Sequence, residues 1–274
     1  MFLTRPTMTA LFILPVLLSG CDQSDLEIET EAEAEATTLR NWNAGDPDRG
    51  VWLNNGLQSP NVTGIDPAFA LSTVQGLAND LGLLDDDRLE TAEYLVECAL
   101  PASKSITKVV DGQTLTFDGL LGLAPEWRTG ACNEDCQEWV SACMLARTNT
   151  SGQPVQIWMQ AEHPAIGMGS SLYFSQYEAS FFGNLFAEEV SLNYCEGTVL
   201  GPLLGQLQGR TCAGLTEEAC PFEQYSLCEF DGRCEFESLA LGLLGPIAAP
   251  TAIDCEANDE AFHTISTFVA PLSL

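Results

Sequence analysis

The sequence predicts an α+β fold, with helices around a small antiparallel sheet with a hairpin, and a disulfide-rich, loop-rich C-terminal lobe. Helical stripes of apolar residues and strand-like alternation both occur between residues 66 and 186. Six of the 11 cysteines fall between Cys195 and Cys255, among glycines and prolines and without clear periodicity. We therefore expect four segments, namely 1–20, 21–40, an α+β core over 41–194, and a cysteine-rich lobe over 195–274 that packs on the core.

The first segment, residues 1–20, has the pattern of an export signal. Arg5 precedes an apolar run from Ala10 to Leu18 that is too short to span a bilayer, and Ser19-Gly20-Cys21 follows it. This order resembles the lipobox of bacterial lipoprotein signal peptides, which implies cleavage before Cys21 and its acylation. An ordinary signal peptide with a chance cysteine is the alternative. The expected location is the cell envelope, at the periplasmic or outer surface, with the membrane reached through lipid on Cys21.

The second segment, residues 21–40, is predicted to be a disordered acidic tether. Seven residues between Asp22 and Ala36 are Asp or Glu, and too few apolar groups are present to repay the entropy of ordering. The whole chain has 10 Lys and Arg against 39 Asp and Glu, a formal net charge of −29. Nucleic acid is therefore not expected as a partner, because phosphate binding needs a basic face. The charge has three interpretations: a surface that stays soluble in salt, a loose store of divalent cations, or a field that attracts cationic partners.

The first half of the core is predicted to contain two helices and a hairpin. One helix follows Asp66-Pro67 and rests on an apolar stripe formed by Phe69, Val74, Leu77, Ala78, Leu81 and Leu84. A second helix follows Asp85-Asp86-Asp87, with an apolar face formed by Leu89, Ala92, Leu95 and Val96. Asp111-Gly112 lies between two strand-like runs, 106–110 and 114–117, and this dipeptide is a strong hairpin signal.

The clearest helix is predicted for residues 132–147. Acidic residues in its first turn and Arg147 in its last turn complement the helix dipole. Its apolar side is formed by Cys136, Trp139, Val140, Cys143 and Ala146.

A strand with one polar face is predicted for residues 155–162. That face carries Gln156, Trp158, Gln160 and Glu162. An aromatic ring beside amides suits a sugar or a polar peptide, so Gln156, Trp158 and Gln160 are candidate ligand-binding residues. The alternative is that a loop or helix covers Trp158 and that its indole N–H finds a partner inside the protein.

Two motifs resemble known sequences. Residues 139–149 read Trp-Val-Ser-Ala-Cys-Met-Leu-Ala-Arg-Thr-Asn, and residues 178–186 read Glu-Ala-Ser-Phe-Phe-Gly-Asn-Leu-Phe. Both resemble motifs of uncharacterised cysteine-rich lipoproteins or secreted proteins of myxobacteria, over about residues 98–186. The resemblance implies an exported, disulfide-bonded protein and no particular activity. In the second motif, Gly183 permits a turn or a close backbone approach.

Ten cysteines besides Cys21 form an even set: Cys98, Cys132, Cys136, Cys143, Cys195, Cys212, Cys220, Cys228, Cys234 and Cys255. In an oxidising compartment this set predicts five disulfides and no free thiol. The spacing of Cys132 and Cys136 alone is a weak zinc signal, since no second close pair of Cys or His at zinc-finger spacing follows and both histidines are solitary in the sequence. No metal is expected.

The pairing of these cysteines depends on where the third helix begins. Residues four apart in a helix have Cβ atoms about 5 to 6 Å apart, whereas a disulfide needs about 3.5 to 4.5 Å. If Cys132, Cys136 and Cys143 are all helical, two of them must pair with cysteines between 195 and 255, and this stapled arrangement is slightly favoured. If Cys132 precedes the helix, a Cys132–Cys136 bridge becomes possible and Cys98–Cys143 completes a separate N-terminal set.

No complete catalytic motif is present, and no cofactor is expected. Glu178, Glu162 and His163 are the candidates for a catalytic role, and the alternative for each is an exposed, capping or structural role. We therefore expect an envelope protein that binds or scaffolds, with an envelope glycan or protein as partner. The alternative is a hydrolase that acts on envelope polymers, glycan or peptide, through carboxylates, since paired carboxylates need no local motif.

Overall fold

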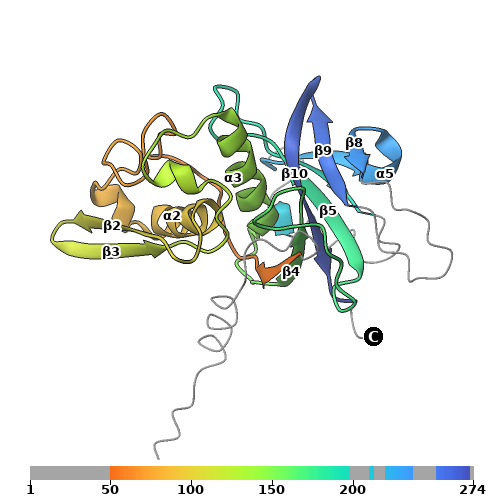
Figure 1. Cartoon of the computed structure of the whole chain (residues 1–274), viewed down its shortest axis with the longest axis horizontal. Coiled ribbons are helices and arrows are strands. Elements are labelled where there is room, and N and C mark those ends of the chain that lie inside the picture. The colour runs from red at the N-terminus through yellow and green to blue at the C-terminus, as the bar shows by residue number, and fades with distance from the viewer. Residues whose placement is uncertain (1–49, 198–209, 213–219, 237–250, 272–274) are drawn as a thin grey trace, which may run out of the picture.

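The computed structural model describes residues 50–197, 210–212, 220–236 and 251–271, and it has the expected α+β fold (Figure 1). The expected signal, the lipidated Cys21 and the acidic tether lie outside the described residues. In chain order the elements are β1 (Val51–Asn54), η1 (Leu81–Leu84), α2 (Asp86–Ala99), β2 (Ser105–Val110), β3 (Gln113–Asp118), η2 (Pro125–Arg128), α3 (Glu134–Arg147), β4 (Gln156–Gln160), β5 (Gln176–Phe182), β6 (Asn193–Glu196), β7 (Glu223–Leu227), α5 (Cys228–Asp231), β8 (Cys234–Phe236), β9 (Ala252–Ala257) and β10 (Glu260–Val269).

The main sheet is larger than the sequence predicted, with eight strands among the described residues. The strand order is β1-β4-β10-β5-β6-β7. In addition, β9 pairs with the first residues of β10, and β8 pairs with β9. Neighbouring strands are antiparallel except β6 and β7, which are parallel. The long strand β10 therefore lies at the centre of the sheet, between β4 and β5, and also pairs with β9 (Figure 1).

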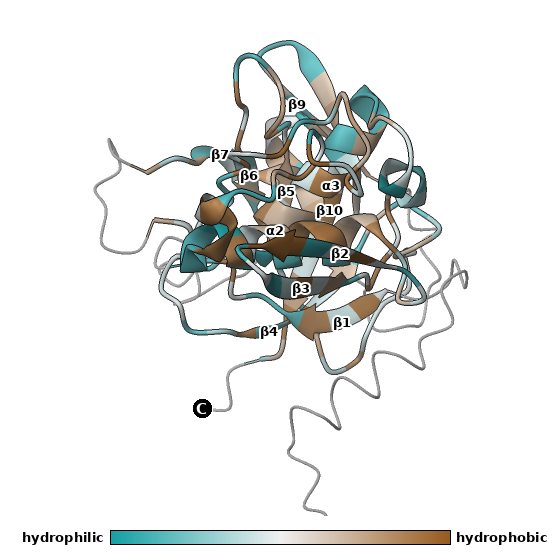
Figure 2. Ribbon diagram, turned by 90° about the vertical axis from the view of Figure 1, so that its left-hand side faces the viewer, coloured by the Kyte–Doolittle hydropathy of each residue, from teal (hydrophilic) through white to brown (hydrophobic). Residues whose placement is uncertain are grey.

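Helix α3 packs on one face of the sheet, against β5 and β10, and α2 packs on α3 (Figure 1). The hairpin β2–β3 lies beyond α2 as a separate two-stranded sheet. Viewed from the hairpin side, hydrophobic ribbon gathers towards the centre of the molecule (Figure 2). Strand alternation divides the sheet's side chains between two apolar clusters: Phe181 and Ile265 lie in the cluster under α3, and Phe182 and Phe268 lie in a second cluster on the opposite face.

Local signals place the second and third predicted helices and the hairpin correctly. The Asn133 side chain accepts a hydrogen bond from the backbone N–H of Cys136 and so caps α3, whose first turn is acidic and whose last turn holds Arg147. Strands β2 and β3 are joined by Asp111 and Gly112, with φ angles of 47° and 79°. Positive φ at both residues is the type I′ geometry that matches the twist of the two strands.

The helix predicted after Asp66-Pro67 is wrong. The chain forms turns there, followed only by the short 3-10 helix η1. The backbone N–H of Leu71 donates to the carbonyl of Trp127, and the Trp127 indole donates to the carbonyl of Phe69. These long-range hydrogen bonds take the place of the backbone hydrogen bonds of a helix. Leu71 is buried as a result, while Phe69 stays exposed.

The prediction of five disulfides is confirmed, and the stapled pairing is wrong. The bonds are Cys98–Cys143, Cys132–Cys136, Cys195–Cys228, Cys212–Cys220 and Cys234–Cys255. Cys132 precedes the cap residue Asn133, so its backbone is free of helical geometry and its Cα lies 5.3 Å from that of Cys136. The four N-terminal cysteines therefore pair with one another.

The segment after residue 194 joins the core through strand pairing instead of disulfides. Strand β10 contributes the centre of the sheet, and β6 and β7 extend it. No helix in the described part of the chain has the length and apolar character needed to cross a membrane.

Candidate functional site

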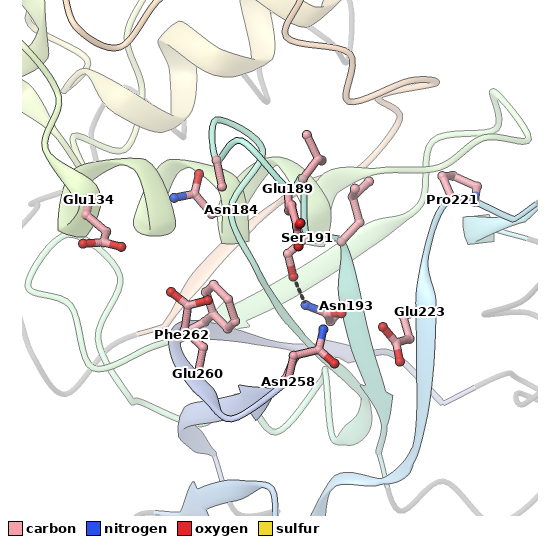
Figure 3. Close-up of a pocket in the computed structure, with 14 residues that line it drawn as sticks. Glu134, Asn184, Glu189, Ser191, Asn193, Pro221, Glu223, Asn258, Glu260 and Phe262 are labelled. Carbon is pink, nitrogen blue, oxygen red and sulfur yellow. Dashed lines mark hydrogen bonds between the residues drawn. The ribbon is translucent and has the colours of Figure 1, made fainter.

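A polar pocket of about 380 Å³ opens where the start of α3, the loop between β5 and β6, β7 and the β9–β10 turn meet (Figure 3). Its lining includes four glutamates and three asparagines, namely Glu134, Glu189, Glu223, Glu260, Asn184, Asn193 and Asn258. No Lys, Arg or His is among the described residues that line it. Pro221, Phe262 and several small side chains complete the wall.

The loop between β5 and β6 is held in place by a close backbone approach, by hydrogen bonds within it and by one hydrogen bond to α3. Gly183 has a φ of 135°, and a Cβ atom added there would lie 2.2 Å from the carbonyl oxygen of Ser191, so this close approach requires glycine. The Ser191 N–H donates to the carbonyl of Asn184, and the amide of Asn193 donates to the Ser191 hydroxyl at 2.6 Å. The backbone N–H of Leu185 donates to the hydroxyl of Ser141 on α3.

The opposite walls are also fixed. Asn258 and Asp259 have φ angles of 52° and 66°, which form the tight turn between β9 and β10. The N–H of Glu223 donates to the carbonyl of Leu192, so the start of β7 is bonded to the loop that enters β6. The pocket is thus formed by segments that the fold holds together, although they are distant in the sequence.

A histidine joins two of these walls. The ring of His263, on β10, stacks on Trp139 of α3 with centroids 4.3 Å apart and planes at 10°. Its Nε2 lies 2.8 Å from a carboxylate oxygen of Asp135, and its Nδ1 lies 3.2 Å from one of Asp254 on β9. Both ring nitrogens of His263 thus face a carboxylate, which links α3, β9 and β10 at this point.

Glu138 adds to the same contact between α3 and β10. Its carboxylate accepts a hydrogen bond from the backbone N–H of His263 at 3.1 Å. Burial raises the pKa of Glu138, the charges of Glu134 and Glu260 raise it further, and the bond and charge of His263 oppose this rise. Glu134 and Glu260 also line the pocket, so the charges of the pocket act on Glu138.

The predicted platform on β4 is covered. The indole N–H of Trp158 donates to the carbonyl of Gly169 at 2.8 Å, and its ring stacks on Phe174. Gln160 is buried: its amide donates to the same carbonyl, and its oxygen accepts from the hydroxyl of Thr251. Gln156 is exposed at the start of the strand. The three residues therefore do not share an open surface, because the loop after β4 lies over two of them.

Glu178 forms a structural ion pair. Its carboxylate lies 2.5 Å from a guanidinium nitrogen of Arg210 and accepts a hydrogen bond from the hydroxyl of Thr267. Arg210 also donates to the carbonyls of Ala146 and Thr148, which end α3. No local sequence pattern indicated Arg210 as the partner of Glu178, because the two residues lie 32 positions apart.

Glu162 and His163 are adjacent in the sequence and take different positions. Glu162 is exposed, whereas the ring of His163 packs edge-on against Trp139. The Nδ1 of His163 accepts a hydrogen bond from the backbone N–H of Ala165. Burial lowers the pKa of this histidine, and the charge of Asp135 opposes that shift. Glu178, Glu162 and His163 do not line the pocket. The two histidines that looked solitary in the sequence thus contact the same tryptophan.

Comparisons of the chain with protein-family models, curated proteins and solved structures found no match.

Proposed function

We propose that the protein is an envelope lipoprotein whose folded domain binds a small, positively charged ligand in the pocket of Figure 3. The observation that carries this proposal is the lining of glutamate and asparagine, with no cationic side chain among its described residues. The volume of about 380 Å³ falls in the range of small-molecule sites.

The chemistry of the lining favours an amine or a guanidine as the bound group. Carboxylates accept charge-assisted hydrogen bonds from N–H groups, and the asparagine carbonyls offer further acceptors. The formal net charge of −29 also raises the local concentration of cations near the protein. An envelope glycan or peptide that carries free amino or guanidino groups fits this lining.

Calorimetric titration of the full chain tests the proposed ligand class. We expect putrescine and argininamide to bind, whereas the neutral analogues butanediol and glucose do not. Glu223→Gln should weaken binding about tenfold or more, because one charge-assisted hydrogen bond contributes about 1.5 to 3 kcal/mol. Glu162→Gln is the matched control, since Glu162 is exposed and lies outside the lining. Equal affinity in both variants, or no binding of either cation, would overturn the proposal.

The anchor is proposed from the lipobox alone. Cys21 would carry the acyl chains, and the acidic tether would hold the domain away from the anionic headgroups. Metabolic labelling with a clickable fatty acid should mark the wild type and not Cys21→Ser. Equal label on both proteins would end the lipoprotein interpretation.

The hydrolase alternative has less support. Glu178 is bonded to Arg210 and Thr267, Glu162 is exposed, and neither glutamate lines the pocket.

A further inference from the structure

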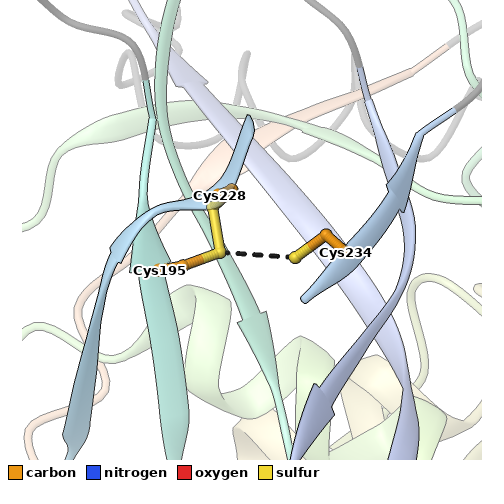
Figure 4. Close-up of side chains that lie close together, drawn as sticks. All are labelled: Cys195, Cys228 and Cys234. Atoms are coloured by element: carbon orange, nitrogen blue, oxygen red, sulfur yellow. Dashed lines mark hydrogen bonds between the residues drawn. A yellow bond between two sulfur atoms is a disulfide. The ribbon is translucent and has the colours of Figure 1, made fainter. Parts of the chain in front are cut away.

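Two disulfides in the C-terminal half of the chain lie against each other. The Sγ atoms of Cys195 and Cys234, which belong to different bridges, are 3.5 Å apart (Figure 4). The sulfurs of Cys195, Cys228 and Cys234 all lie within 4.8 Å of one another. Each is bonded in a disulfide and so does not offer a thiolate to a metal ion.

The four cysteines of these bridges come from four elements. Cys195 is on β6, Cys228 begins α5, Cys234 begins β8 and Cys255 is on β9. Cys195, Cys228 and Cys255 are fully buried, whereas Cys234 is half-buried. A reductant from solution therefore reaches the Cys234–Cys255 bridge before the Cys195–Cys228 bridge.

We propose that these four cysteines form a thiol–disulfide exchange centre, in which Cys195 pairs with either Cys228 or Cys234. An external dithiol first reduces the Cys234–Cys255 bridge, gives up two electrons and two protons, and becomes a disulfide itself. The Cys234 thiolate then attacks the Sγ of Cys195. The bond between Cys195 and Cys234 forms, the bond between Cys195 and Cys228 breaks, and the Cys228 thiolate takes up the proton that Cys234 released. This second step involves no net oxidation or reduction.

The distance between the sulfurs supports this exchange. Reacting atoms that are held about 3 to 3.5 Å apart are in a near-attack arrangement, which favours bond formation. Disulfides also exchange through attack of a thiolate on one sulfur of the bond. Only a small movement of Cys234 is needed, because its sulfur already lies within 3.5 Å of that of Cys195.

The exchange would move a covalent link within the sheet. In the structure the Cys195–Cys228 bond ties β6 to the end of β7 and to α5. After exchange, the same sulfur of β6 would hold β8 instead. The parallel pair β6–β7 would then rely on its hydrogen bonds alone at this edge of the sheet.

A Cys255→Ser variant of the full chain tests the exchange directly, because it leaves Cys234 without its partner. After alkylation under non-reducing conditions, we expect label on both Cys234 and Cys228, and a peptide that links Cys195 to Cys234. Cys220→Ser is the matched control, since it frees Cys212 from the separate Cys212–Cys220 bridge. There the label should stay on Cys212 alone. Label only on Cys234 in Cys255→Ser, with the Cys195–Cys228 bridge intact, would overturn the proposal.

Partial reduction of the wild type provides a test that does not depend on the variant's folding. Brief treatment with dithiothreitol, followed by alkylation at low pH, should yield molecules with label on Cys228 and Cys255 and a link between Cys195 and Cys234. If labelled Cys255 is found only together with labelled Cys234, and never with labelled Cys228, the exchange does not occur.

Discussion

At the residue scale, the indole of Trp158 joins the middle of β4 to the loop that follows it. The ring is half-buried against Phe174, and its N–H donates to the carbonyl of Gly169. Directly opposite on β1, Trp52 is the cross-strand partner of Trp158. A Cβ atom on Gly50 would lie 2.3 Å from the indole nitrogen, so the chain before β1 also packs closely on this ring.

These contacts predict that Trp158 contributes to stability. Trp158→Ala should lower the free energy of unfolding by about 3 kcal/mol or more, because it removes a large packed ring. Trp158→Phe keeps much of the ring and loses the hydrogen bond, so its cost should be about 1 kcal/mol. Urea unfolding of both variants measures these values. A loss well below 1 kcal/mol in Trp158→Ala, together with loss of ligand binding, would instead favour the binding platform.

The alternation that placed Trp158 on the polar face of its strand was visible in the sequence, and the cover over that face was not. The loop that covers this face contains no recognisable motif. Its Gly169 interacts with Trp158 and Gln160 only through a backbone carbonyl. A backbone acceptor leaves no trace in side-chain patterns. The pairing of Glu178 with Arg210 was not predictable either, because it depends on the fold bringing Arg210 to the end of α3.

At the scale of elements, the hairpin β2–β3 is attached to the turns before η1 by a buried lysine. Lys108 lies on the inner face of β2, and its ammonium group donates to the carbonyl of Thr73 at 2.5 Å. On the outer side, the amide of Asn79 donates to the carbonyl of Val109. Burial lowers the pKa of Lys108 from 10.5 to about 8, because the charged form loses its hydration.

This shift predicts a rise in stability at alkaline pH. Between about pH 8 and pH 10.5 the unfolded chain binds more protons at Lys108 than the folded chain does. The free energy of unfolding should therefore increase as pH rises through that window. Urea titrations at several pH values measure the increase in the wild type, and Lys108→Met should remove Lys108's share of it. The same pH dependence in both proteins would contradict the prediction.

Elements with local signals were predictable, and those defined by distant contacts were not. Helix α3 has its cap, its charges and its apolar side within one stretch of sequence, and the turn of the hairpin is fixed by Asp111 and Gly112. The stretch before η1 has a helical pattern but bonds to Trp127 instead. The lining of the pocket includes Glu134, Glu223 and Glu260 from three separate segments, so no local sequence pattern predicted it.

At the scale of the whole molecule, the core and the C-terminal segment share one sheet. Strand β10 pairs with β4 on one side and with β5 on the other, so both depend on it for their hydrogen bonds. Arg210 adds a second link, since it donates to carbonyls at the end of α3. Disulfides do not provide this coupling, because each described bridge joins cysteines on the same side of residue 194.

We therefore predict that a chain ending at residue 250 does not fold. Without β9 and β10 the sheet loses its centre, and the apolar face of α3 loses much of its cover. The near-ultraviolet circular dichroism of the truncated chain should lack native signals, and its thermal unfolding should show no cooperative transition. A cooperative transition near the wild-type temperature would show that the chain folds without β9 and β10 and would contradict the prediction.

The central position of β10 also sets the order in which the native structure can form as the chain is synthesised. A nascent chain emerges from its N-terminus, so β4 and β5 leave the ribosome about 80 to 100 residues before the strand that separates them. Until then each has an edge without its native neighbour, which is a known route to wrong association. The bridges Cys98–Cys143 and Cys132–Cys136 have no such delay, because both partners of each are made early. Once the chain meets an oxidising environment, these two bridges can therefore form before the sheet is complete, and the final step of folding waits for residues 260–269.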